Sequence, residues 1–273
     1  MLEFKVISLH GAPRSGTSWL GKIFDSHPAV AYRFQPLFSY RFKGAIDVHS
    51  TREEVERFLV DVHAVSDDDF ILQSRQKERG AHPNDFAKAA APNVLVMKEV
   101  RYHYVIRTLL RHVPGIKIVG IVRHPCGAIN SWLKTPREFK PEWNPTDEWR
   151  DAPSKNQQRS EEYYGFTKWK ELAQLFLSLA AEHPESFYLI RYEPLVASPA
   201  PETRKLLAFC GLDMPRQVGD FVASSQKREV EDPDSVFRKA DVADRWKQEL
   251  PAVIRDSILS ELQGTELEIF LRA

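Results

Sequence analysis

A glycine-containing segment near the N-terminus has the residues and spacing of a phosphate-binding loop. Residues 11–19 read GAPRSGTSW and stand between a short apolar run and a helical pattern. In such a strand–turn–helix, successive backbone N–H groups and the positive end of the helix dipole face a bound anion. The segment therefore predicts a phosphate cradle, and a plain structural turn is the alternative.

The segment differs from the loop of nucleotide triphosphatases in the position of its cation. Its two glycines have the GxxxxG spacing, but Thr17 follows where those enzymes carry lysine. The cation lies inside the loop, at Arg14, and Arg123 rather than an acid ends the apolar run 116–122. This pattern favours neutralising phosphate with side chains, and no metal is expected.

A second group of candidate anion ligands follows the run 116–122. Arg123 stands at its end, before His124 and Pro125, and Ser131 lies eight residues after the arginine, within a helical pattern. A guanidinium fork and a hydroxyl suit a terminal phosphate monoester. The alternative for Arg123 is a surface salt bridge.

These two segments resemble the two fingerprints of the sulfotransferases that use 3′-phosphoadenosine 5′-phosphosulfate (PAPS). Residues 13–19 match the first fingerprint, and Arg123 with Ser131 matches the second. The resemblance implies that Arg14 lies against the sulfonyl group and its bridging oxygen, and that Trp19 packs on adenine. It also implies that Arg123 and Ser131 bind the 3′-phosphate. The resemblance further implies that the 5′-phosphate is bound by the backbone and hydroxyls of four residues: Ser15, Gly16, Thr17 and Ser18.

Two later segments resemble the same family. Tyr192 begins a Tyr-Glu-Pro-Leu segment, similar to the family's Tyr-Glu-Asp-Leu, whose tyrosine contacts adenine. Arg238 and Lys239, followed by Trp246, resemble an Arg-Lys-Gly loop that closes on the 3′-phosphate, although Ala240 stands where glycine is usual. The matches run from residue 4 to about residue 250, which is nearly the whole chain.

The resemblance leaves the catalytic base unassigned. Lys98 stands where many relatives carry a second active-site lysine, which would act as an acid or bind the leaving phosphate; a solvent-exposed lysine at a strand end is the alternative. Val100 and Gln35 stand where two branches of the family carry histidine and glutamate. The nearest titratable candidates are Glu99 and His103. Adjacent strand residues point to opposite faces, so we do not expect both Lys98 and Glu99 at the site, and His103 has a helix start as its alternative.

Composition and charge indicate a globular protein whose basic first half is compatible with a small anionic ligand; chance clustering of solvated charges is the alternative. The chain has 273 residues, with 38 Lys plus Arg and 38 Asp plus Glu, so its formal net charge is zero. That balance argues against a broad nucleic-acid surface. Residues 1–135 carry 19 basic and 13 acidic side chains, which suits a small anionic ligand there. The two cysteines form no disulfide framework, and no apolar stretch reaches membrane-span length, so we expect a cytoplasmic protein.

Short apolar runs alternate with helical patterns along the chain. The runs 4–9, 94–97, 116–122 and 187–190 predict buried parallel strands. The predicted helices cover residues 18–26, 52–65, 104–112, 127–133, 161–182, 201–209 and 252–262. This alternation predicts an α/β fold with a central parallel sheet flanked by helices, and the resemblance implies the P-loop nucleotide-kinase-like form of it, as a single sulfotransferase domain over residues 1–273. The proline-rich stretch 134–158 predicts a long loop over a binding site, and 224–243 is polar and irregular.

The sequence thus predicts a sulfotransferase that moves a sulfonyl group from PAPS to a hydroxyl or amine by in-line displacement. The product of the donor would be adenosine 3′,5′-bisphosphate (PAP), and the acceptor a small molecule or carbohydrate. The amino-acid sequence of residues 27–37 resembles the bacterial and carbohydrate branches of the family more than the aryl branch. A P-loop-type kinase or a catalytically inactive nucleotide-binding relative is the alternative, and a homodimer is compatible with the sequence.

Overall fold

A parallel sheet forms the centre of the molecule. The structure is a computed structural model, and it describes residues 2–80, 86–227, 236 and 243–272. Within these residues, five strands pair in the order β2-β3-β1-β4-β5, and each neighbouring pair is parallel. The strands are β1 (Lys5–Gly11), β2 (Val30–Phe34), β3 (Val94–Glu99), β4 (Lys117–Val122) and β5 (Phe187–Arg191). The predicted α/β class with a central parallel sheet is confirmed.

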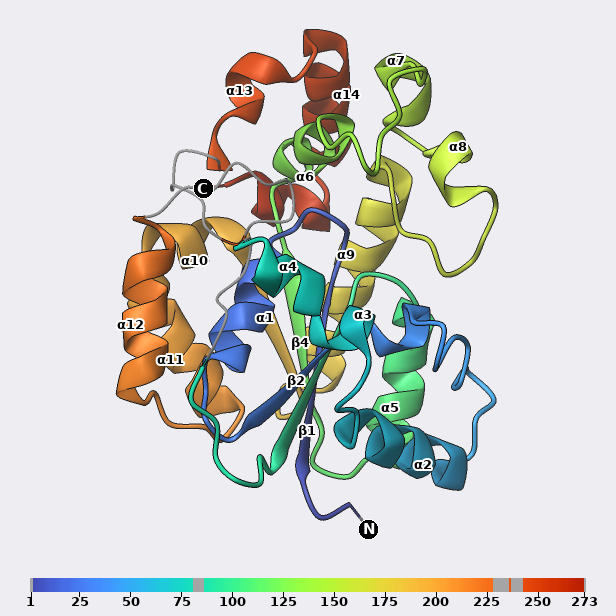
Figure 1. The fold of residues 1–273 in the computed structure, drawn as a ribbon. Helices are drawn as coiled ribbons and strands as arrows, with labels where there is room; N and C mark the ends of the chain where they lie inside the picture. Colours follow the sequence, from blue (N-terminus) through green and yellow to red (C-terminus); the bar gives the residue numbers. More distant parts are fainter. Residues whose placement is uncertain (1, 81–85, 228–235, 237–242, 273) are drawn as a thin grey trace.

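Helices cover both faces of this sheet (Figure 1). One face carries α1 (Thr17–Asp25), α10 (Tyr192–Ala197), α11 (Pro199–Phe209) and α12 (Arg216–Ser225). The other carries α2 (Arg52–His63), α5 (Ile106–His112) and α9 (Phe166–Glu182). The apolar core of that side also includes residues of α6 (Pro125–Leu133) and α14 (Ala252–Leu262), which pack against each other. Shorter turns of helix are η1 (Pro36–Phe38), α3 (Asp69–Leu72), α4 (Ser74–Glu78), η2 (His103–Val105), α7 (Pro145–Glu148), α8 (Pro153–Asn156), α13 (Trp246–Glu249) and η4 (Glu266–Leu271).

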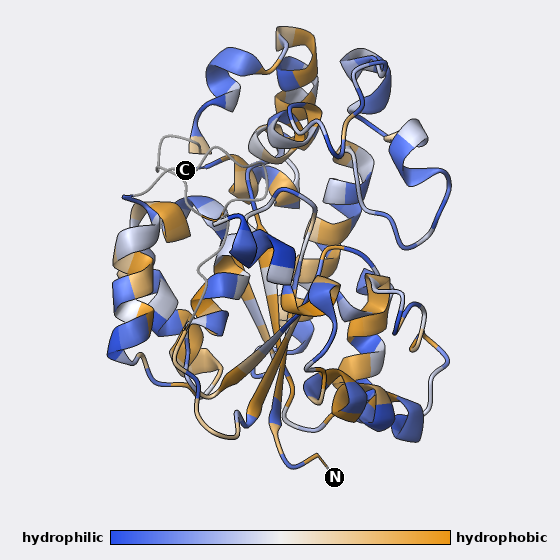
Figure 2. Cartoon of the chain, in the orientation of Figure 1, coloured by the Kyte–Doolittle hydropathy of each residue, from blue (hydrophilic) through white to orange (hydrophobic). Residues whose placement is uncertain are grey.

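The strands are apolar along their length because both of their faces are buried (Figure 2). Val6 and Leu95 pack with the helices of one face, and their neighbours Ile7 and Val96 pack with those of the other. Alternating side chains thus contribute to two separate apolar cores, one on each side of the sheet. None of the helices in the described ranges is long and apolar enough to cross a bilayer.

The structure adds a strand that the sequence patterns did not predict. β2, Val30–Phe34, pairs only with β3 and forms one edge of the sheet. It is five residues long and includes Arg33, whose guanidinium donates to the carbonyl oxygens of Tyr32, Val62 and His63. A short edge strand with a charged residue lacks the apolar run that identifies the buried strands.

The starts of α1, α5, α6, α9 and α11 differ by one to five residues from the predicted starts, and two of them have a clear local cause. α9 begins at Phe166 rather than residue 161, because Gly165 has a φ of 88° and Glu162 turns inward to pair with Arg101 at 2.8 Å. α6 begins at Pro125 rather than residue 127, because His124 is its N-cap and accepts a hydrogen bond from the backbone of Cys126 at 3.2 Å. A proline in the first turn suits a helix start.

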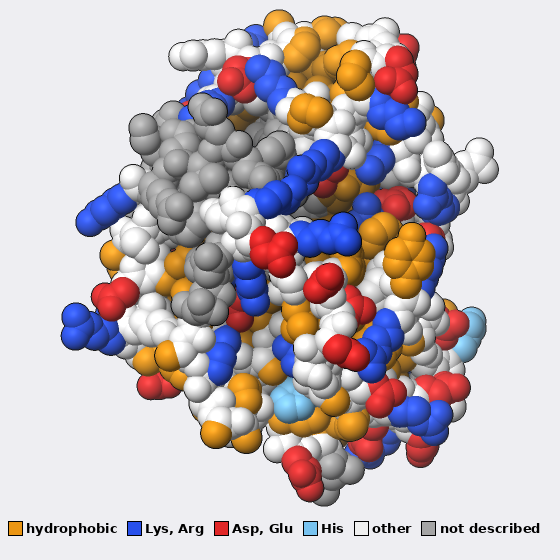
Figure 3. Space-filling view, in the orientation of Figure 1, with side chains coloured by type: hydrophobic (Ala, Val, Ile, Leu, Met, Phe, Trp, Pro, Cys, Tyr) orange, Lys and Arg blue, Asp and Glu red, His pale blue; other side chains and the backbone are white. Residues whose placement is uncertain are grey.

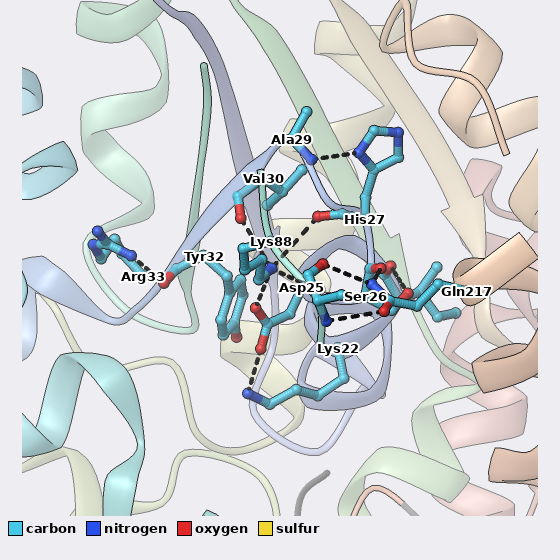
Figure 4. A network of polar contacts seen from close by, with 12 residues as sticks. Lys22, Asp25, Ser26, His27, Ala29, Val30, Tyr32, Arg33, Lys88 and Gln217 are labelled. Atoms are coloured by element: carbon cyan, nitrogen blue, oxygen red, sulfur yellow. Dashed lines mark hydrogen bonds and ion pairs between the residues drawn. The ribbon is translucent and has the colours of Figure 1, made fainter. Parts of the chain in front are cut away.

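A buried charge network holds the C-terminal end of α1 against the start of β2 (Figure 4). Asp25 lies between two ammonium groups, each 2.9 Å from one of its carboxylate oxygens: Lys22 and Lys88. Lys88 also donates to the carbonyl oxygen of Val30 at 2.9 Å. Burial alone would raise the pKa of Asp25, but the two cations hold it at about 2. The network thereby fixes the helix whose opposite end begins at the glycine-containing loop.

Candidate active site

A cavity of about 560 Å³ opens at the carboxyl ends of the strands, where parallel α/β sheets bind ligands. The loop after β1 forms one wall, and α3 and α4 contribute residues on the face seen in Figure 1. Lys and Arg side chains gather around the middle of this face in Figure 3. The predicted site residues that line the cavity are Arg14, Gly16, Thr17, Ser18, Trp19, Lys98, Arg123, Ser131 and Tyr192.

The loop between β1 and α1 depends on glycine at one position. Gly16, the N-cap of α1, has a φ of 89°, in the left-handed region that favours glycine. A Cβ atom there would lie 2.5 Å from the ring of Tyr192. The neighbouring Ser15 is fully buried, and its hydroxyl has no hydrogen-bond partner among the described residues. A buried, unpartnered donor in such a loop fits a loop that holds an anion.

Two predicted ligands from a distant part of the chain, Ser131 and Arg123, contact Arg14. Its Nε donates to Ser131 Oγ at 3.2 Å, and its carbonyl oxygen accepts from Arg123 Nη1 at 3.1 Å. Arg14 itself has a φ of 68°, a left-handed conformation that costs a non-glycine residue about 1–2 kcal/mol. Strain of this kind is characteristic of functional loops. The two motifs that the sequence predicts to bind anions therefore converge in one cavity.

Aromatic side chains line the cavity beside these cations. The guanidinium carbon of Arg123 lies 4.7 Å from the ring centre of Tyr192, a cation–π contact. Trp19 and Tyr192 are each only 9% exposed, and Trp19 Nε1 donates to Ser225 Oγ in α12 at 3.0 Å. These two rings form an apolar wall with Val196 of α10, suitable for a flat base.

The C-terminal motif is described only in part. Arg238 and Lys239 lie outside the described residues. Trp246, which follows them, stacks on His124 with ring centres 4.3 Å apart and planes 20° apart. Burial, and then the charge of Arg123, lowers the pKa of His124 to about 4, so the stacked imidazole is neutral at pH 7. The described end of the C-terminal motif thus packs directly on the segment that carries Arg123.

Lys98 is a buried residue of the cavity wall. It is 3% exposed, at the end of β3, and its Nζ lies 4.4 Å from the ring centre of Phe34. Burial lowers the pKa of Lys98 to about 7. The ammonium and neutral forms are therefore close in free energy, and an anion bound beside Lys98 would favour the ammonium form.

Binding of PAP is expected to take up a proton at Lys98. At about pH 8 the side chain is mostly neutral in the free protein, and the phosphate charges return it to the ammonium form. PAP affinity should accordingly fall as the pH rises above about 7. Calorimetry in buffers of different ionisation enthalpy measures this uptake, which Lys98→Met should abolish. Lys140→Met removes an exposed lysine outside the cavity lining and should retain it; equal uptake in both variants would contradict the assignment.

The structure does not bring Glu99 or His103 to the cavity. Glu99 is fully buried on the opposite side of β3 from Lys98, where its Oε1 accepts from the backbone of Leu37 at 2.9 Å. Burial raises the pKa of Glu99 to about 8. His103 Nδ1 lies 3.0 Å from Nδ1 of the buried His10, and burial keeps the pKa of both rings low, so both are neutral.

The cavity also contains residues that motif analysis did not select. Gln35, in place of the family's glutamate, lines it with a φ of 43°, and its Oε1 accepts from Arg101 Nη1 at 3.0 Å. The proline-rich stretch 134–158 supplies three more lining residues: Arg137, Glu138 and Lys155. The prolines and tryptophans of this stretch predicted a long surface loop; in the structure α7 and α8 interrupt it. In the described part of the chain, no group of three or more His, Cys, Asp or Glu could hold a metal ion.

The fold and the cavity together define an α/β protein whose loop after β1 places an arginine in a cavity at the carboxyl ends of the strands. The model of a family described as "Sulfotransferase family" matches residues 7–216, and the chain therefore belongs to the sulfotransferase family. No curated protein sequence matches the chain significantly.

Solved structures resemble the chain over nearly its whole length. A mouse sulfotransferase complexed with PAP is 14% identical with a TM-score of 0.56, and the match covers 98% of this chain and 88% of that one. The sulfotransferase domain of a Synechococcus olefin synthase is 18% identical with a TM-score of 0.55, covering 100% and 97%. Retinol dehydratase in complex with androsterone and inactive cofactor PAP is 12% identical with a TM-score of 0.57, covering 96% and 82%. These likenesses confirm the sulfotransferase fold.

Proposed function

We propose that the protein transfers a sulfonyl group from PAPS to a hydroxyl or amine of a small-molecule or carbohydrate acceptor. The convergence of Arg14, Ser131 and Arg123 in one cavity carries this proposal. PAPS has a 5′-phosphosulfate and a 3′-phosphate, so it needs two anion sites close together. The loop and the end of β4 would supply those two sites.

Each cation has a distinct part in this reaction. In-line displacement at sulfur builds negative charge on the phosphate oxygen that leaves, and a preorganised cation stabilises that charge. Arg14 supplies this charge from the loop, and because a guanidinium does not release its proton, its help is electrostatic. Lys98, whose pKa is lowered to about 7 by burial, binds the leaving phosphate or protonates it.

Two comparisons support PAP as the product. The mouse sulfotransferase and retinol dehydratase were both solved with PAP bound.

We further propose a single sulfotransferase domain over residues 1–273, and a cytoplasmic location, which suits the two free, buried cysteines, Cys126 and Cys210. A P-loop kinase is disfavoured by Thr17 in the place of lysine; magnesium-dependent ATP turnover would support that alternative.

Removing Arg123 should distinguish the contributions of the two phosphates of PAP to the binding affinity. Arg123→Ala is expected to weaken PAP by about 30-fold but adenosine 5′-phosphate by less than about 3-fold, because only PAP has the 3′-phosphate that the guanidinium would bind. Calorimetry of both nucleotides measures the difference. Arg107→Ala is the matched control, because Arg107 pairs with Glu182 and does not line the cavity. Equal losses for the two nucleotides would contradict the assignment of Arg123.

The activity itself is tested with labelled PAPS and a broad panel of hydroxyl and amine acceptors. Transfer to any of them establishes the reaction and begins to identify the acceptor class. If the wild-type protein does not bind PAP, or binds it no better than adenosine 5′-phosphate, the proposed donor is wrong.

A further inference from the structure

The cavity contains a single acidic side chain among its described lining residues, Glu138. We propose that Glu138 is the general base that removes the proton from the acceptor hydroxyl. The proposal rests on the proposed function, since it concerns the same reaction. It supplies a group that neither Gln35 nor Val100 can provide, because an amide and an alkyl side chain cannot accept a proton at neutral pH.

Glu138 lies beside the residue assigned to the sulfonyl group. Its Oε2 is 3.9 Å from Arg14 Nη1. The same oxygen is shielded from solvent and has no hydrogen-bond partner among the described residues, although the side chain as a whole is 28% exposed. That oxygen faces Arg14 inside the protein, so an acceptor hydroxyl entering the cavity would meet the exposed part of the carboxylate. A carboxylate has two oxygens, and either can accept a hydrogen bond from a hydroxyl.

The backbone of Glu138 is held in place from two sides. Its N–H donates to the carbonyl oxygen of Thr135 at 2.9 Å, and its carbonyl oxygen accepts from Trp132 Nε1 at 3.3 Å. The hydroxyl of Thr135 donates in turn to the carbonyl oxygen of Ser131, whose side chain contacts Arg14. The loop residue is therefore fixed to the end of α6, the same helix that supplies a predicted phosphate ligand. A base needs this kind of positioning.

Glu138 shares the cavity with several groups that could be considered for the role of base or that carry positive charge. Cationic side chains that line the same cavity include Lys98, Arg101 and Lys155. Other groups fit the role of base less well. Lys98 would be returned to its ammonium form by the donor phosphates, and Glu99 and His103 do not line the cavity.

The proposed step balances without a further reactant. The carboxylate of Glu138 takes the proton as the acceptor oxygen bonds to sulfur. The bond between sulfur and the bridging oxygen breaks, and its electron pair stays on the 5′-phosphate of the PAP that leaves. Arg14 faces that oxygen. Base catalysis of this kind is worth about 10²–10⁴-fold.

The test compares Glu138→Gln with Glu142→Gln, which removes an exposed carboxylate from the same loop. The rates measured are transfer to the best hydroxyl of the acceptor panel and hydrolysis of PAPS by water, which needs no acceptor. Glu138→Gln should lower both by about 10²-fold, remove the acidic limb of the pH–rate profile and change PAP affinity by less than about 2-fold. Glu142→Gln should behave as wild type. Formate should restore part of the rate to Glu138→Ala.

Three results would overturn the proposal while leaving the proposed function intact. The first is an unchanged rate in Glu138→Gln. The second is a loss of PAP affinity as large as the loss of rate, which would mean that Glu138 only holds Arg14 in position. The third is an acidic limb that persists in the variant. Failure of the wild-type protein to bind PAP is a different outcome, because it contradicts the donor itself.

Discussion

Arg14→Ala is expected to slow sulfonyl transfer by about 10³-fold, the largest loss of rate among the changes considered. The side chain lies in the cavity between Ser131 and Glu138. In the proposed reaction its charge would act on the oxygen that leaves. The effect belongs mainly to the transition state, in which that oxygen gains charge. The loss should therefore appear more in kcat than in PAP affinity.

Arg14→Lys is the informative companion of this variant. It keeps a positive charge in the loop but removes the fork that contacts Ser131, so it should recover part of the rate. Arg41→Ala, which removes an exposed arginine paired with Asp67, should have no effect on transfer. Steady-state rates with PAPS and calorimetry with PAP provide the measurements. A loss of less than about 10-fold in Arg14→Ala would contradict the electrostatic role.

Gly16→Ala should have the largest effect on stability and should abolish PAP binding. Its Cβ would meet the Tyr192 ring at 2.5 Å in a backbone with a φ of 89°. The left-handed conformation costs about 1–2 kcal/mol and overpacking about 1–3 kcal/mol, so the free energy of unfolding should fall by about 2–5 kcal/mol. The clash also separates the loop from Tyr192, so the predicted phosphate and adenine contacts are disturbed together.

Gly44→Ala isolates the strain from the clash. Gly44 has a φ of 66°, but no atom lies within 4 Å of an added Cβ. This control should lose only about 1–2 kcal/mol and bind PAP normally. Denaturant unfolding and calorimetry measure the two quantities. If the two alanine variants lose the same stability and bind PAP alike, the contact between Gly16 and Tyr192 has no special importance.

The sequence predicted what is local in the chain. The four buried runs became strands, and the loop after β1 and the arginine after β4 both line the cavity, because a motif of contiguous residues carries its own geometry. β2 was not predicted, since an edge strand gains its structure from pairing with β3 rather than from an apolar run. The sequence pattern therefore predicted the elements whose signal is local and missed the strand that depends on its tertiary partner.

The position of a base could not be predicted in the same way. Glu99 and His103 are close to Lys98 in the sequence, but neither lines the cavity, and Glu99 lies on the other side of the strand. Glu138 is distant from Lys98 in the chain and belongs to no motif; the packing of its loop on α6 brings it to Arg14. Proximity to Lys98 in the sequence therefore selected residues that do not line the cavity, whereas the predicted phosphate ligands Arg14, Arg123 and Ser131 do line it.

The left-handed backbone of Arg14 has a consequence for how this loop can change. Glycine at this position would relieve a conformational cost of about 1–2 kcal/mol, but it would also remove the cation from the cavity. Stability and activity thus favour different residues at one site. Engineering for heat resistance alone would select against the arginine, so this position has to be held constant in any such programme.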